Sequence, residues 1–160
     1  GARRMAAWVA AAVPGGRLEG FLVSEMVPAG VECLVGVRRD AVFGPLLTVA
    51  LGGTLVELYR DAARRLAPVT PAIARAMLEE LVSYRLLTGY RGSGACDVDA
   101  LVDCICRVSE FAARHAERVE VIEVNPVRVL PAGSGAIALD AVVELTDAGA
   151  PMQLQRRTAT

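Results

Sequence analysis

The 160-residue sequence contains no lysine, a single histidine and only 4 % aromatic residues. All 17 basic residues are therefore arginines, and 18 acidic residues bring the net charge to −1. This balance gives no general attraction to nucleic acid or to an anionic lipid surface. No apolar run approaches the roughly 20 residues that span a bilayer. We therefore expect neither nucleic acid nor a membrane as a partner, and we expect the lone His115 to be a surface residue.

The four cysteines lack the spacing of a zinc site. Cys104 and Cys106 are two residues apart on an expected helix and point to different faces, and no CxxC pair or matching histidine accompanies them. With 54 % apolar residues the chain does not need disulfides to hold a core. We expect Cys33, Cys96 and these two to be free, mostly buried thiols of a cytoplasmic protein.

The apolar residues are mainly Val, Leu and Ala, enough for the core of one domain or one large piece of a domain. The opening residues 3–10 place two arginines before an apolar run, a pattern shared by short signal peptides and amphipathic helices. We favour a helix over 3–12 with Trp8 packed inward, ended by Pro14. Residues 1–19 then form an N-terminal helix and linker.

Alternating apolar residues and turn residues predict strands in the next part of the chain. Pro28-Ala29-Gly30 predicts a turn between the first two, which would run antiparallel as part of a meander with one buried face. The expected strands are Phe21–Val27, Glu32–Arg38, Pro45–Leu51 and a short one over Leu55–Tyr59.

Two helices and a hairpin follow. Thr70-Pro71 begins the first helix and Gly89 ends it, while Asp97 caps the second, whose apolar stripe includes Leu101 and Ile105. Strands are expected over 119–130 and 136–145, joined by the turn 131–135, with a polar tail after Thr146. The order predicts an α+β fold with a mainly antiparallel sheet and two main helices packed on one face.

The hairpin carries the polar residues that suggest chemistry. Glu123 and Asn125 are two apart in a strand and share a face, and a regular hairpin places Asp140 almost opposite Pro126, beside Asn125. Carboxylate and amide oxygens are ligands that Mg²⁺ prefers. The alternative is that these are three polar residues on the solvent-exposed face of a hairpin, with no metal. A bulge at Pro126 would shift the strand register by one residue and separate them.

Several short motifs, in order, resemble the ATP-grasp part of NDP-forming acyl-CoA synthetases such as ADP-forming acetate–CoA ligase. The same module occurs in acyltransferases that modify protein lysines. The hairpin contributes Glu-x-Asn-Pro at 123–126 and Leu-Asp-Ala at 139–141. The other matching segments are Glu25-Met26-Val27, Gly30-Val31-Glu32, Gly36–Asp40, Phe43-Gly44-Pro45, Leu51-Gly52-Gly53, Arg65–Pro68 and Gly89–Gly92. The resemblance identifies residues 20–146 as an ATP-grasp C-terminal subdomain, with 147–160 as a tail.

The resemblance implies ATP or ADP and Mg²⁺ as cofactors. It implies that Ser24, Glu25, Met26 and Val27 form the hinge that holds adenine, largely through backbone groups. Glu32 matches an acidic residue at the nucleotide. Asn125 and Asp140 match the Mg²⁺ ligands. Glu123 matches a catalytic carboxylate near the site where a phosphohistidine is made or read. The loops at Gly52-Gly53 and 89–94 are equally well explained as phosphate-facing backbone or as tight turns.

The family's first subdomain is expected to supply a phosphate-binding lysine, and this chain has none. We therefore expect the N-terminal ATP-grasp subdomain and the CoA-binding domains as partners, in the same or another chain, and no activity from this chain alone. One hypothesis is an ADP-forming ligase that makes acyl-CoA from a carboxylic acid, CoA and ATP through a phosphohistidine. The alternative is a non-catalytic regulatory or oligomerisation module of a protein acetyltransferase, in which an exposed wall favours a homodimer.

Overall fold

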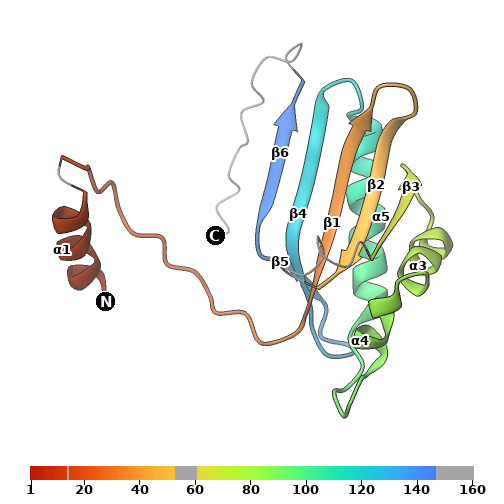
Figure 1. The fold of residues 1–160 in the computed structure, drawn as a ribbon, viewed down its shortest axis with the longest axis horizontal. Helices are drawn as coiled ribbons and strands as arrows, with labels where there is room; N and C mark the ends of the chain where they lie inside the picture. The colour runs from red at the N-terminus through yellow and green to blue at the C-terminus, as the bar shows by residue number, and fades with distance from the viewer. Residues whose placement is uncertain (14, 53–60, 147–160) are drawn as a thin grey trace, which may run out of the picture.

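The computed structural model describes residues 1–13, 15–52 and 61–146, and the structural statements below concern these residues. Strands come first, then helices, then a hairpin (Figure 1), as expected for the α+β class. The elements are α1 (Ala2–Ala12), β1 (Val31–Asp40), β2 (Gly44–Leu51), β3 (Ala62–Leu66), α3 (Pro71–Glu79), the 3-10 helix η1 (Val82–Tyr84), α4 (Arg85–Thr88), α5 (Val98–Arg114), β4 (Val119–Val129), β5 (Ala136–Ala138) and β6 (Ala141–Leu145).

One sheet has the strand order β3-β2-β1-β4-β5, and β6 also pairs with β4. Every pairing is antiparallel, which confirms the predicted sheet type. Figure 1 shows α5 running behind β1 and β2, with α3 and α4 on the same side of the sheet. This arrangement confirms the prediction of two main helices on one face, and no helix of the described residues lies on the other face.

The core lies between the sheet and its helices. Strand β1 buries every second residue, Cys33, Val35 and Val37, and α5 meets them with Leu101 and Ile105. Each fully buried Val or Leu contributes about 1.5–3 kcal/mol through removal of apolar surface from water. The alternation that predicted the strand is therefore also the pattern that fixes which face of the sheet the helices cover.

The two main helices begin where their capping residues predict. The Thr70 hydroxyl accepts a hydrogen bond from Ile73 N–H at 3.4 Å. One Asp97 oxygen accepts from Ala100 N–H at 3.1 Å, and the other accepts from Gly135 N–H at 2.8 Å. The hydrogen bonds from Gly135 and Ala100 lower the pKa of Asp97. Asp97 thus caps α5 and holds the hairpin turn 131–135 against it.

The single helix expected between Thr70 and Gly89 is wrong, because the helix breaks after Glu79. The Asp61 carboxylate, just before β3, accepts hydrogen bonds from Val82 N–H at 3.0 Å and Ser83 N–H at 2.8 Å. Burial raises the pKa of Asp61, but the bonds from Ser83 and Val82 outweigh it and leave the pKa lowered. The N–H groups of Val82 and Ser83, which a continuous helix would bond to its own carbonyls, are instead bonded to Asp61. The helix therefore ends before them.

The predicted strand Phe21–Val27 is also wrong, and this segment runs as an irregular arm outside the sheet. Both edges of β1 are already occupied by β2 and β4, so no edge remains for it. The side chains of Leu22, Val23 and Met26 are more than nine-tenths exposed. The helix expected over 3–12 is present as α1, but Trp8 is 70 % exposed and α1 buries no residue. Figure 1 shows α1 apart from the sheet, at the end of the arm.

One predicted strand cannot be compared with the structure, and one observed strand was not predicted. The short strand expected over Leu55–Tyr59 lies outside the described residues. The edge strand β3, Ala62–Leu66, was not expected, because its sequence Ala-Ala-Arg-Arg-Leu lacks strand propensity. Among the helices of the described segments, none combines the length and apolar character needed to cross a bilayer.

Candidate functional site

Two of the predicted site residues meet on the open face of the sheet. Glu123 and Asn125 lie on β4 with exposed side chains, while Ile122 and Val124 between and beside them face the helices. The Asn125 side-chain amide Nδ2 donates a hydrogen bond to Glu123 Oε1 at 3.0 Å. The shared face predicted from the two-residue spacing is therefore present.

Asp140 lies one position from its predicted partner. The pairs Val124–Ala141 and Val127–Ala138 place Asp140 opposite Asn125, not opposite Pro126. Asn125 N–H donates to the Asp140 carbonyl oxygen at 3.2 Å. The Asp140 carboxylate accepts from Ala141 N–H at 2.9 Å. Asp140, in the short gap between β5 and β6, is thus a neighbour of Asn125 on β4.

The sheet is irregular at the level of Asn125. Opposite β1, the register shifts between Cys33 and Val35, so that Asn125 and Pro126 together face the single residue Leu34. This is a β-bulge, which re-aims side chains locally. The return strand is interrupted at the same level, between β5 and β6, where Asp140 lies. The hairpin register, which is the same on both sides of the bulge, places Asp140 opposite Asn125.

The donor chemistry of the three residues fits a hard cation such as Mg²⁺. Because a carboxylate only accepts hydrogen bonds, the Asn125 amide nitrogen must face Glu123, which turns its Oδ1 the other way. Within the described parts of the chain, no three His, Cys, Asp or Glu side chains gather as a metal cluster. Mg²⁺ commonly takes one or two protein oxygens and completes its shell with water and phosphate. The residues present match that sparse kind of site.

The predicted hinge residues Ser24–Val27 lie on the exposed arm. Their backbone makes one hydrogen bond to the sheet within the described residues, from Arg128 Nη1 to the Val27 carbonyl at 3.5 Å. Glu32, on β1, forms an ion pair with Arg128, its cross-strand partner on β4. The structure therefore brings Glu32 and the end of the hinge together, a few residues along β4 from Asn125.

Two further residues shape this region: Arg128, for which the sequence predicted no role, and Gly30, which it predicted only as part of a turn and a matching motif. A Cβ atom on Gly30 would lie 2.4 Å from the Val129 carbonyl oxygen and 3.0 Å from Arg128 Cγ, so only glycine fits there. Gly30 was expected in a hairpin turn, and its role is instead a close approach of the arm to β4. The contacts of Arg128 could not be predicted from its neighbours in the sequence, because they depend on its cross-strand pairing with Glu32.

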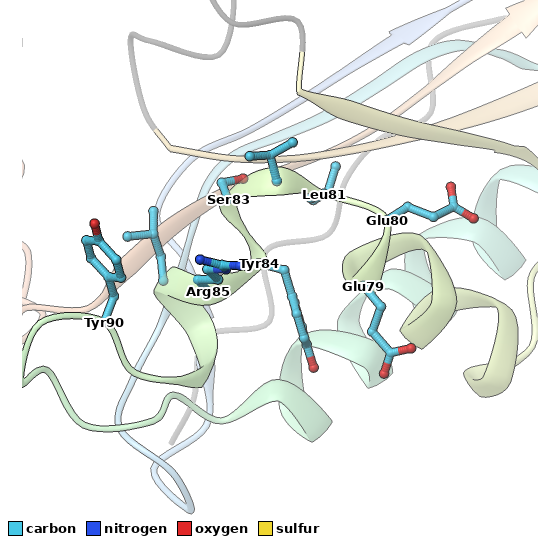
Figure 2. Close-up of a pocket in the computed structure, with 9 residues that line it drawn as sticks. Glu79, Glu80, Leu81, Ser83, Tyr84, Arg85 and Tyr90 are labelled. Carbon is cyan, nitrogen blue, oxygen red and sulfur yellow. The ribbon is translucent and has the colours of Figure 1, made fainter.

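A pocket of about 790 Å³ lies elsewhere, where α3 passes through η1 into α4. Figure 2 shows Glu79 and Glu80 toward one end, Tyr90 at the other, and Tyr84 and Arg85 between them. It is wide open, and Glu80 is already paired with Arg65. None of the predicted site residues lines it. We therefore place the candidate site by the chemistry of Glu123, Asn125 and Asp140.

The other chemistry-bearing residues do not join the site. All four cysteines are free, and burial, followed by the nearby Cys96 and Cys104, raises the pKa of Cys33 far above its ordinary value. A thiol held in its protonated form is a poor nucleophile. His115 ends α5 with its ring 4.5 Å from that of Phe111. In the glycine-rich loop, the Arg91 guanidinium lies over the Tyr90 ring at 5.3 Å.

The chain belongs to the ATP-grasp family, whose ATP-grasp domain model matches residues 1–145. It is 41 % identical over 121 residues to ADP-forming acetate–CoA ligase I of Archaeoglobus fulgidus, covering 76 % of this chain and 18 % of the ligase. It is 34 % identical over 132 residues to the β subunit of ADP-forming acetate–CoA ligase II of Pyrococcus furiosus, covering 82 % of this chain and 56 % of the subunit.

Solved structures of acetyl-coenzyme A synthetase are also similar to this chain. One is Ca. Korarchaeum cryptofilum dinucleotide-forming acetyl-coenzyme A synthetase 1 with coenzyme A and Mg-AMPPCP, its phosphohistidine segment pointing towards the nucleotide-binding site. That structure gives a TM-score of 0.70 at 37 % identity, over 75 % of this chain and 55 % of the other. A second structure of the same protein, with a phosphorylated phosphohistidine segment, gives a TM-score of 0.80 and covers 90 % of this chain and 63 % of the other. The chain therefore spans less than two thirds of these relatives.

Proposed function

We propose that this chain is the ATP- and Mg²⁺-binding part of an ADP-forming acyl-CoA synthetase. The whole enzyme would form acyl-CoA from a carboxylic acid, CoA and ATP through a phosphohistidine. The observation that carries the proposal is the meeting of Glu123, Asn125 and Asp140 at the bulge of β4. The relatives described above, which are ligases and synthetases, support it, and one of them binds Mg-AMPPCP.

The roles of the side chains follow from their chemistry. Asn125 and Asp140 would hold Mg²⁺ through oxygen atoms, while the Glu123 carboxylate fixes the Asn125 amide with its oxygen turned outward. A bound Mg²⁺ neutralises phosphate charge during phosphoryl transfer. Glu123 is exposed, so it also remains available to a phosphohistidine segment that approaches the open face. Glu32 and the backbone of Ser24–Val27 would hold the nucleoside end.

The partners belong to the proposal as well. In the described part of the chain no helix covers the open face of the sheet. A metal–triphosphate held by one wall alone is weakened by solvent, because water screens each contact and competes for it. The other ATP-grasp subdomain and the CoA-binding domains would supply the second wall, the phosphate-binding lysine and the histidine. Relatives that are separate β subunits and relatives that are much longer single chains both support this view.

Calorimetric titration of Mg-ATP into this 160-residue chain, and into the longest natural protein that contains it, tests the proposal. We expect tight binding in the longer protein and binding at least tenfold weaker, about 1.4 kcal/mol, in the chain alone. Formation of acyl-CoA with release of ADP by the longer protein tests the reaction itself. Absence of Mg-ATP binding in both would contradict the proposal.

A further inference from the structure

Arg128 of β4 contacts both the end of the predicted hinge and Glu32. It lies on β4 opposite Glu32, three residues beyond Asn125, and its side chain is 23 % exposed. The guanidinium pairs with the Glu32 carboxylate through Nη2 and reaches the Val27 carbonyl through Nη1. One cation therefore links the end of the hinge, an acidic residue proposed at the nucleotide, and the strand that carries Asn125.

The stability of the sheet does not account for this arginine. Its Nε–H is buried without a hydrogen-bond partner among the described residues. A buried donor without a partner opposes folding, and a methionine would cover the same strand position without leaving one. What an apolar residue would not provide is the pair of contacts to Glu32 and Val27. The contacts to the hinge, not the packing, are therefore the distinctive contribution of Arg128.

The arm depends on this point of attachment. Leu22, Val23 and Met26 are almost fully exposed, so burial does not hold the hinge in place. Gly30 brings the arm directly against the Val129 carbonyl, and Arg128 Nη1 supplies the hydrogen bond that fixes Val27 just before it. The Val27 carbonyl is taken by Arg128, whereas the backbone groups of Ser24–Met26 make no hydrogen bond within the described residues and are available to a ligand.

From these contacts we infer that Arg128 is a positioning residue for the nucleoside end of the site, an inference that rests on the proposed nucleotide-binding function. It holds the hinge and the Glu32 carboxylate at a fixed place relative to Asn125. A hinge held before binding loses less conformational entropy when the ligand arrives. Arg128 therefore strengthens binding of the nucleoside and leaves binding of the metal-bound phosphates unchanged.

The test uses the longest natural protein with Arg128→Met, Arg128→Lys and, as a matched control, Arg107→Met. Arg107 is an exposed arginine of α5 whose ion pair is with Asp103 of the same helix. The first measurement is the NMR order parameter of the backbone amides of residues 24–27 without ligand. We expect values below about 0.6 in Arg128→Met, partial recovery in Arg128→Lys, and the wild-type values in the control.

The second measurement is calorimetric affinity for Mg-ADP and for Mg-tripolyphosphate. We expect Arg128→Met to weaken Mg-ADP about tenfold and to leave Mg-tripolyphosphate within about twofold. Equal weakening of both ligands, or unchanged order parameters of the hinge, would overturn the inference alone. A wild-type protein that binds neither ligand would overturn the proposed function as well, and the order parameters would still show whether Arg128 holds the hinge.

Discussion

The two faces of β4 differ in what covers them. On one face Ile122, Val124 and Val127 lie under α5 as part of the core, whereas on the other Glu123 and Asn125 are exposed. One face of β4 thus contributes to the hydrophobic core, and the other presents the candidate metal-binding residues. Because polar residues on the open face contribute little to the core, they are free to be selected for binding. Substitutions on the two faces should therefore separate the free energy of unfolding from nucleotide affinity.

The largest effect is expected at the open face. In the longest natural protein, Asn125→Leu keeps the size of the side chain but removes the amide oxygen proposed to hold Mg²⁺. We expect acyl-CoA formation to fall on the order of 100-fold or more, measured as the rate of ADP release. Glu120→Gln, on the same strand, is the control and should keep the wild-type rate. Equal rates for Asn125→Leu and the control would contradict the comparison.

The opposite pattern is expected on the covered face. Leu101 of α5 is fully buried against the sheet, so Leu101→Ala leaves a cavity and should lower the free energy of unfolding by about 3 kcal/mol. Chemical denaturation measures the loss, and Val82→Ala, at a side chain that is 85 % exposed, should stay within about 0.5 kcal/mol. Nucleotide affinity of the folded fraction should not change in either variant.

A smaller, pH-dependent effect is expected from Asp61, which anchors the helix layer. Its pKa is lowered in the folded state, so its stabilisation is present above the ordinary value of 3.8 and is lost as the pH falls through the folded pKa. Thermal unfolding of wild type and Asp61→Asn between about pH 6 and about pH 2 measures this. We expect the melting temperature of the wild type to fall more steeply below 3.8, and parallel curves would contradict the assignment.

The smallest effect is expected far from both faces. Trp8 of α1 is 70 % exposed and contacts no core residue, so Trp8→Ala should change the free energy of unfolding by less than about 0.5 kcal/mol. Denaturation of the 160-residue chain checks this value. A loss above about 1 kcal/mol would place α1 against the sheet in solution.

Local sequence patterns correctly predicted the helices and strands whose positions depend on apolar alternation and capping residues. Alternation around Val35 predicted β1, and the caps Thr70 and Asp97 predicted the starts of the two main helices. Contacts between distant residues decided the rest. The Asp61 carboxylate breaks the helix after Glu79, and the occupied edges of β1 leave Phe21–Val27 without a strand to pair with.

The same distinction between local patterns and long-range contacts applies to the candidate site. The two-residue spacing correctly predicted the shared face of Glu123 and Asn125, because strand geometry alone sets it. The register of Asp140 was one residue off, because the hairpin closes with Val129 opposite Ala136, and this register continues to Val124 opposite Ala141. The contacts of Arg128 depend on pairing with Glu32, nearly a hundred residues earlier in the chain, and no local signal marks them.

The most direct test of the central claim compares two carboxylates on one side of the hairpin. Mg-ADP is titrated calorimetrically into the longest natural protein carrying either Asp140→Asn or Glu144→Gln, a second exposed carboxylate four residues further along the same strand region. We predict at least tenfold weaker binding, about 1.4 kcal/mol, for Asp140→Asn and wild-type affinity for Glu144→Gln. Wild-type affinity in both variants would contradict the assignment of the open face as the metal–nucleotide site.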